Sequence, residues 1–133
     1  RATDELLEMV GLVEQRDVKF DDLSGGQQQR LSVALALVGY PRVLILDELT
    51  TGLDPAARRR MWATVEAMQR DGVTILLVSH AMEEVERLCD RVALLAAGEL
   101  IALDTPAGLV AGTGSHNLDE AFLTLTGERA GGA

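Results

Sequence analysis

The order of apolar and polar residues along the chain predicts alternating helices and strands. Apolar residues recur at helical spacing in Thr3–Val10, in a segment that Ser24 opens, and in a segment that Asp54-Pro55 opens. Two shorter runs, Val43–Asp47 and Val73–Val78, are instead apolar almost throughout. Runs of this kind are typical of parallel strands that are covered on both faces. We therefore expect a mainly parallel sheet between helices.

Spacing within the first half of the chain also predicts which side chains are buried. Gly11 should end the first helix in a left-handed conformation. In the polar connector that follows, Val18 and Phe20 should attach the segment to the body of the domain. The expected buried stripe of the second helix is Leu31, Leu35 and Val38. The expected core face of the third helix is Met61, Trp62, Val65 and Met68, followed by a stop at Gly72.

The second half predicts a helix, a strand pair and two further helices. The helix over Ala81–Cys89 should turn Met82, Val85 and Cys89 inward and its glutamates outward. A strand pair is expected around a turn that contains Gly98. Thr105-Pro106 predicts the start of a helix by a cap and a proline, and Asn117 followed by Glu120 predicts another.

Composition narrows the classes of partner. The formal net charge is −9 and the isoelectric point is about 4.6, which argues against binding to nucleic acid. Cys89 is the single cysteine, so no internal disulfide is possible. The apolar runs are shorter than the roughly 20 residues that a membrane-spanning helix needs. We expect any association with a membrane to occur through a partner.

Three groups of polar residues lie where phosphate chemistry is possible. Asp47 and Glu48 end the first strand, where one acid suits Mg²⁺ and its neighbour suits a general base. Ser24 begins a helix whose first amides are ready to bind phosphate. His80 follows the second strand, so a parallel pair should bring it to the sheet edge that carries the acids. Each group alone also fits an ordinary cap or a solvated surface.

The combination of these groups resembles the second half of an ATP-binding cassette (ABC) nucleotide-binding domain. Leu23-Ser24-Gly25-Gly26-Gln27 is similar to the signature motif of that family, and Leu44 to Glu48 is similar to its Walker B strand with the catalytic glutamate. Gly52 to Asp54 resembles the D-loop, and His80 resembles the switch histidine. Nearly the whole chain is covered by the resemblance.

The resemblance implies an α/β, P-loop NTPase-like layered fold with a mainly parallel sheet. The fold is expected to be incomplete, because no Gly-x-x-x-x-Gly-Lys-Ser/Thr occurs and the single lysine, Lys19, lies elsewhere. Residues 1–41 are expected to form part of the helical subdomain with the signature motif. Residues 42–133 are expected to form the C-terminal part of the ATPase core.

The resemblance also implies roles for individual residues, with ATP and Mg²⁺ as cofactors. Asp47 is expected to organise Mg²⁺, and the expected catalytic residues are Glu48, which polarises water, and His80, which contacts the terminal phosphate. The residues expected to bind the nucleotide, partly that of an opposite protomer, are Ser24, Gly25, Gly26, Gln27 and Asp54. Leu49 departs from the family, which usually has proline after the catalytic glutamate.

The implied function is that of an ATP-hydrolysing subunit of an ABC transporter that exports drugs or small molecules. The stretch from Met82 to Leu109 and the ending Phe122-Leu-Thr-Leu-Thr-Gly127 most resemble bacterial subunits of the daunorubicin-resistance kind. The implied partners are a second nucleotide-binding domain in a head-to-tail dimer and a membrane-spanning permease subunit. The implied location is peripheral, on the cytoplasmic face of the membrane.

Two alternatives remain open at this point. One is a soluble ABC ATPase without a role in transport, and the other is a non-enzymatic fragment that only dimerises. Without a phosphate-cradling loop, the 133-residue chain by itself is expected neither to bind nor to hydrolyse ATP. The transported substrate is not encoded here, because the family's membrane subunits choose it.

Overall fold

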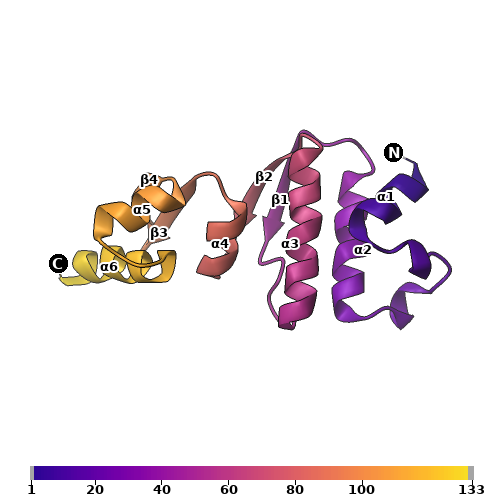
Figure 1. Ribbon diagram of the computed structural model, residues 1–133, viewed down its shortest axis with the longest axis horizontal. Coiled ribbons are helices and arrows are strands. Elements are labelled where there is room, and N and C mark those ends of the chain that lie inside the picture. Colours follow the sequence, from indigo (N-terminus) through magenta and orange to yellow (C-terminus); the bar gives the residue numbers. More distant parts are fainter. Residues whose placement is uncertain (1, 132–133) are drawn as a thin grey trace. The chain divides into compact units, whose positions relative to one another are not determined.

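A computed structural model describes the backbone of residues 2–131 and the side chains of residues 2–127. The chain divides into two compact units, Arg1–Val78 and Ser79–Ala133 (Figure 1). The first unit contains α1 (Thr3–Val10), two 3₁₀ turns η1 (Val13–Gln15) and η2 (Phe20–Asp22), α2 (Gly25–Leu37), β1 (Val43–Asp47), α3 (Pro55–Arg70) and β2 (Thr74–Val78). The second unit contains α4 (Met82–Leu88), β3 (Val92–Ala96), β4 (Glu99–Asp104), α5 (Pro106–Thr113) and α6 (Leu118–Gly131).

The helices of the first unit pack on one another, with α1 against α2 and α3 and with α2 against α3. α1 ends at Gly11, whose φ of 70° is the predicted left-handed cap. Arg30 of α2 donates from Nη1 to the carbonyl oxygen of Val10 at 3.1 Å. The guanidinium therefore satisfies a carbonyl that the end of α1 leaves without a partner in its own helix.

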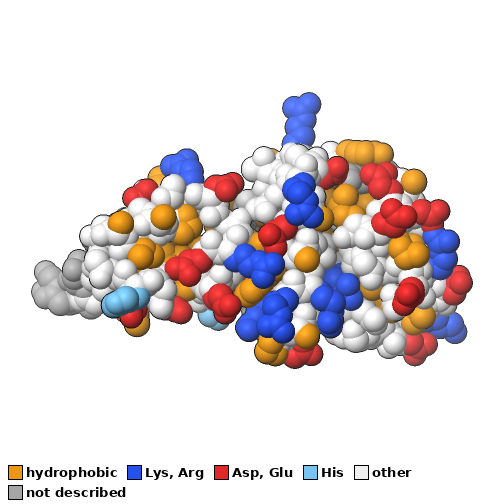
Figure 2. Space-filling view, in the orientation of Figure 1, with side chains coloured by type: hydrophobic (Ala, Val, Ile, Leu, Met, Phe, Trp, Pro, Cys, Tyr) orange, Lys and Arg blue, Asp and Glu red, His pale blue; other side chains and the backbone are white. Residues whose placement is uncertain are grey.

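α3 supplies much of the core of this unit, and its predicted core face is confirmed. Its large buried side chains are Met61, Trp62, Val65 and Met68. The basic run at its start is divided between two environments: Arg59 and Arg60 are exposed, whereas Arg58 is half-buried. The guanidinium carbon of Arg58 lies 5.6 Å from the centre of the Trp62 ring, a cation–π distance. Basic side chains gather over α3 in Figure 2.

The two strands of the first unit pair in parallel, as predicted, with Asp47 opposite Val78. The expectation that both faces of the strands are covered is wrong for the described residues. Leu44 and Leu46 are buried, but the alternating position Ile45 is 65% exposed. An unbroken apolar run shows that a strand can be buried on both faces, but it does not show what covers each face. Within this unit only one face of the two-stranded sheet is covered.

The predicted buried stripe of α2 is also wrong. Leu31 is half-buried, and Leu35 and Val38 are exposed. The side chains of α2 that are buried are Val33, Ala34 and Leu37. From residue 31 to residue 38 every position except Ser32 is apolar, so the pattern contains several possible stripes. Packing against the neighbouring helices selects the stripe that periodicity leaves undecided.

The connector before α2 is held by a different contact from the one expected. Val18 and Phe20 are not part of the core as expected, because they are 43% and 49% exposed. Gln28 of α2 instead donates from Nε2 to the carbonyl oxygen of Phe20 at 2.9 Å. A hydrogen bond from a side chain to a backbone carbonyl therefore holds this segment, and no hydrophobic pattern predicts such a bond.

The second unit has its own hydrophobic core and its predicted strand pair. β3 and β4 are antiparallel and turn at Ala97 and Gly98, both with positive φ. The buried members of the core are Met82, Val85, Val92, Leu94, Leu109, Leu118 and Ala121. Cys89 packs against this core, and burial, followed by the charges of Glu84 and Asp90, raises the pKa of its thiol. The expectation that the glutamates of α4 all face outward is wrong for Glu84, which is 1% exposed.

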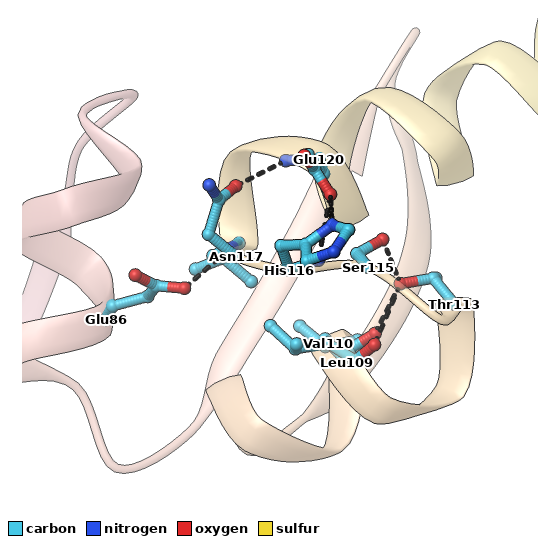
Figure 3. A network of polar contacts seen from close by, with 9 residues as sticks. Glu86, Leu109, Val110, Thr113, Ser115, His116, Asn117 and Glu120 are labelled. Carbon is cyan, nitrogen blue, oxygen red and sulfur yellow. Dashed lines mark hydrogen bonds and ion pairs between the residues drawn. The ribbon is translucent and has the colours of Figure 1, made fainter.

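Polar contacts lie at the end of α5 and at the start of α6, and one of them reaches α6 from Glu86 of α4 (Figure 3). α5 ends at Thr113, and its C-cap, Gly114, is left-handed. Asn117 caps α6 as predicted, since its Oδ1 accepts from the amide of Glu120 at 2.9 Å. The amide of Leu118 donates to the carboxylate of Glu86. These bonds satisfy amides at the start of α6 that would otherwise lack partners.

The boundary between the two units does not test the predicted subdomains. In the sequence it falls between Val78 and Ser79. The division into residues 1–41 and 42–133 concerns the larger family domain, and it stays a prediction.

Candidate functional site

The candidate site of the first unit begins where β1 ends. Asp47 is the last residue of β1, and its side chain is exposed. The amide of the next residue, Glu48, donates to the carbonyl oxygen of Val78 at 2.8 Å, which extends the parallel pairing by one bond. The apolar strand thus places two successive carboxylates at the sheet edge, as the sequence predicts.

Glu48 has an unusual backbone conformation. Its φ is 54°, in the left-handed region that costs a non-glycine residue about 1–2 kcal/mol. Glu48 is half-buried, and its Oε2 accepts a hydrogen bond from Oγ1 of Thr51 at 2.9 Å. The chain therefore turns sharply at Glu48, and the carboxylate lies against Thr51, three residues further along the loop. Thr51 is a neighbour of the candidate base that no sequence motif identified.

A second contact from α2 holds the same loop. Nε2 of Gln29 donates to the carbonyl oxygen of Leu49 at 3.1 Å. Leu49 is buried, so a residue that departs from the family pattern is here an anchor in the core. Sequence analysis missed Gln29 because a bond between side chain and backbone over twenty positions leaves no periodic signal.

The start of α2 carries the signature residues in a closed cap. Oγ of Ser24 accepts from the amide of Gln27 at 3.1 Å, and Oε1 of Gln27 accepts from the amide of Ser24 at 3.0 Å. This reciprocal pair is a capping box. The space beside Gly25 is open, because an added Cβ would meet no atom within 4 Å. The backbone of α2 is thus accessible at its first residue.

The second glycine of the signature has a packing role. A Cβ on Gly26 would lie 3.4 Å from Cβ of Ala57 and 3.9 Å from Cδ2 of Leu53. Asp54 lies between those two positions and caps α3, since its Oδ1 accepts from the amide of Ala57 at 2.7 Å. The structure therefore brings the starts of α2 and α3 together, and with them the signature residues and the candidate D-loop residue Asp54.

The remaining candidate, His80, belongs to the second unit and has an exposed side chain. Its position relative to Asp47 and Glu48 stays a prediction. The hydroxyl of Ser79, the residue before it, donates to Oε2 of Glu84 at 2.7 Å and accepts from the amide of Ala81 at 3.0 Å. Sequence analysis assigned no part in the site to Ser79 or Glu84.

The described residues of the first unit do not form a metal site by themselves. Among the described residues, no three histidine, cysteine, aspartate or glutamate side chains are grouped so as to hold a metal ion. Asp47 also borders an open hollow of about 210 Å³ between α2 and β1, whose only other polar lining residues are Gln29 and Ser32. Such a lining supplies too few donors for a phosphate group.

Comparison with known proteins tests the family resemblance. Residues 1–51 match the family model described as ABC transporter. The Nod factor export ATP-binding protein I of Neorhizobium galegae is 49% identical over 105 residues, which cover 79% of this chain and 30% of that protein. The linearmycin resistance ATP-binding protein LnrL of Bacillus subtilis is 40% identical over 123 residues, which cover 92% of this chain and 39% of that protein.

Solved structures test the fold. MJ1267, an ATP-binding cassette of an ABC transporter, matches with a TM-score of 0.73 and 23% identity over 95% of this chain and 46% of its own. Its ADP conformation matches with a TM-score of 0.74 and 23% identity over 90% of this chain and 47% of its own.

These comparisons confirm the resemblance to ABC ATP-binding proteins that the motifs predicted, and they confirm the α/β fold of the P-loop NTPase type. The chain spans 30 to 39% of the length of the two curated relatives and less than half of the solved cassette.

Proposed function

We propose that this chain provides part of the ATP-hydrolysing machinery of an ABC transporter. The observation that carries the proposal is the start of α2. α1, α4 and α6 have acidic residues in the first turn, and α3 is capped by Asp54. At the start of α5, the carboxylate of Asp104 accepts from the amide of Thr105.

Among the α-helices that the structure describes, α2 alone begins without such a carboxylate. Its cap is Ser24, and its first turn has no acidic residue. In a chain with a net charge of −9, this helix start has no acid at its cap or in its first turn to compete with an anion for the positive end of the dipole. Ser24, Gly25, Gly26 and Gln27 would contact the terminal phosphate of ATP bound mainly to a second nucleotide-binding domain.

Asp47 is the residue that would hold Mg²⁺. Nucleotide-bound Mg²⁺ commonly uses one or two protein carboxylates and completes its shell with phosphate oxygens and water. An exposed aspartate at the end of a strand fits that donor set. The bound ion would neutralise charge on the phosphates.

Glu48 would be the general base. Its carboxylate accepts a bond from Thr51, and the backbone around it is held by the bonds of Glu48 to Val78 and of Leu49 to Gln29. Fixed position is what a general base requires for proton abstraction from water. His80 would contact the terminal phosphate, and Asp54 would join the nucleotide site at the interface of the dimer.

The proposed assembly has two nucleotide-binding domains in a head-to-tail dimer and a membrane-spanning permease subunit. No described helix is long and apolar enough to cross a bilayer. We propose a peripheral position at the cytoplasmic face of the membrane, held through the permease. Because the names of the two curated relatives refer to Nod factor export and to linearmycin resistance, we propose export of a drug or small molecule.

The experiment that tests this function is Glu48→Gln in the complete protein. The amide keeps the size of the side chain but cannot take a proton, so kcat should fall by roughly 10² to 10⁴-fold. ATP binding should stay within a few-fold of wild type. Glu14→Gln, at an exposed position of η1, is the matched control and should change neither quantity. A Glu48→Gln enzyme that hydrolyses ATP within tenfold of the wild-type rate would refute the assignment.

A further inference from the structure

The second unit contains a buried carboxylate that the proposed mechanism does not use. Glu84, at 1% exposure, is the one charged residue among the described side chains that is fully buried. It occupies the first turn of α4, next to the exposed Glu83. Burying a carboxylate is unfavourable unless hydrogen bonds compensate. Its position therefore requires an explanation from its contacts.

The contacts form a relay from the carboxylate of Glu84, through the side chain of Ser79, to the amide of Ala81, and Ser79 and Ala81 are the two neighbours of His80. The hydroxyl of Ser79 donates to Oε2 of Glu84 at 2.7 Å. The same hydroxyl oxygen accepts from the amide of Ala81 at 3.0 Å. A hydroxyl has one proton to donate and lone pairs to accept, so both bonds form at once. Residues 79 and 81 are thus tied together, and His80 lies at the apex of the loop that they close.

This relay does more than an ordinary helix cap requires. Ala81 is the N-cap of α4 and has no side-chain bond of its own. A serine or aspartate at position 81 would cap the helix directly. The exposed Glu83 already places negative charge at the positive end of the helix. The buried partner and the hydroxyl before His80 instead fix the backbone from which the imidazole projects.

We propose that Glu84 is a positioning residue for His80 and acts through the hydroxyl of Ser79. The inference rests on the proposed function, in which His80 contacts the terminal phosphate of ATP. Glu84 itself touches neither nucleotide nor water in this scheme. It holds the loop of residues 79–81 in the shape that directs the histidine.

Two pairs of variants test the relay in the complete protein. The loss variants are Glu84→Leu, which removes the acceptor, and Ser79→Ala, which removes the hydroxyl. The conservative variants are Glu84→Gln, which keeps an acceptor oxygen, and Ser79→Thr, which keeps a hydroxyl. Glu83→Leu makes the same change at the exposed neighbouring position and is the matched control. Amide hydrogen exchange at Ala81 reports the relay, and steady-state kinetics report its effect on ATP hydrolysis.

We expect Ser79→Ala and Glu84→Leu each to raise the exchange rate of the Ala81 amide about tenfold and to lower kcat about tenfold, with the KM for ATP within twofold. A displacement of a catalytic group by about 1 Å is enough for a change of that size or larger. The double variant should be no worse than the worse single variant, because both changes remove the same relay. Ser79→Thr and Glu84→Gln should restore most of both signals, and Glu83→Leu should leave them unchanged.

Three results would overturn the proposal. One is an unchanged exchange rate at Ala81 in either loss variant. Another is a double variant whose losses are the product of the single losses, which would mean separate roles. The third is faster exchange at the Ala81 amide in a loss variant whose kcat is unchanged, when Glu48→Gln has been shown to abolish ATP hydrolysis in the same protein. If Glu48→Gln leaves hydrolysis intact, the proposed function fails, and the exchange measurements alone then decide whether Glu84 holds the loop.

Discussion

The starts of α2 and α5 have the same hydrogen-bonded cap and differ in what surrounds it. Ser24 accepts from the amide three residues later at 3.1 Å, and Thr105 does the same at 3.0 Å. Both helices also have a glycine in the first turn. At Gly25 of α2 an added Cβ would meet nothing within 4 Å, whereas at Gly108 of α5 it would collide with the carboxyl group of Asp104.

The difference shows that a capped helix start is not yet an anion site. At α5 the carboxylate of Asp104 fills the space beside the first turn and cancels the positive end of the dipole. The first turn of α2 has open backbone and no acid. Access and local charge, rather than the cap, distinguish the proposed phosphate site from a structural helix terminus.

The largest expected effect comes from giving α2 the acid that α5 has. Gly25→Asp places a carboxylate in open space at the first helical position, so the helix should be at least as stable as before. In the proposed dimer this carboxylate faces a phosphate. Repulsion of about 3 kcal/mol or more should weaken ATP-driven dimerisation roughly a hundredfold or more. Sedimentation of a Glu48→Gln background with ATP measures it.

Gly25→Asn is the matched control, because it adds the same volume without the charge. We expect its dimerisation to be weakened less than that of Gly25→Asp. Equal ATP-driven dimerisation in Gly25→Asp and in the parent protein would show that no phosphate approaches the start of α2.

A smaller effect should separate the two caps themselves. Ser24→Ala and Thr105→Ala each remove a side chain that accepts from a first-turn amide, at a cost of about 1 kcal/mol. Amide exchange at Gln27 and at Gly108 should therefore rise by similar factors. Only Ser24→Ala should also weaken ATP-driven dimerisation, by about tenfold, since only that hydroxyl is proposed to meet a phosphate. Equal dimerisation in both variants would reduce Ser24 to a structural cap.

Both caps were predictable from the sequence because capping is local. Ser24, Thr105 and Gly11 act on residues within one helical turn, so residue type and spacing are sufficient. The same holds for Asp47 at the end of its strand, since the run that precedes it is short and apolar. These local signals located the elements and most of the candidate site residues.

The features that sequence analysis missed depend on contacts between distant positions. Which apolar face of α2 is buried, why Glu84 is buried, and why Ile45 is exposed all depend on what packs against them. The bond from Gln29 to Leu49 likewise joins residues twenty positions apart. Local propensity does not depend on such neighbours, so these features follow only from the three-dimensional fold.

The link from α2 to the carboxylate loop suggests a third, more modest test of the comparison. Gln29→Leu removes the donor to Leu49 and should cost about 1 kcal/mol, because the carbonyl loses a partner. The loop after Glu48 should loosen, which should raise amide exchange at Thr51 and lower kcat about fivefold. Gln28→Leu removes a bond to the exposed Phe20 and should leave kcat unchanged. Identical kinetics in both variants would exclude a role for Gln29 in positioning Glu48.

The smallest expected effect concerns Glu120, the acid at the start of α6 (Figure 3). Oε2 of Glu120 accepts from the amide of His116 at 2.8 Å and lies 3.0 Å from Nδ1 of the His116 ring. The bond from the His116 backbone, then that from its ring, lowers the pKa of Glu120. A carboxyl group with a lowered pKa in the folded state stabilises that state fully above its unfolded pKa, and this contribution is lost as the pH falls through the lowered value.

Exchange at the His116 amide, corrected for its intrinsic pH dependence, should therefore accelerate only on the acid side of the ordinary range of a glutamate. Glu120→Gln should remove this acid-dependent step, and Asp119→Gln, at the exposed neighbouring position, should retain it. A step that survives Glu120→Gln would show that another group fixes this terminus. The α2 terminus, which has no acid in its first turn, should show no such step at Gln27, and this completes the contrast between helix starts with and without their own anion.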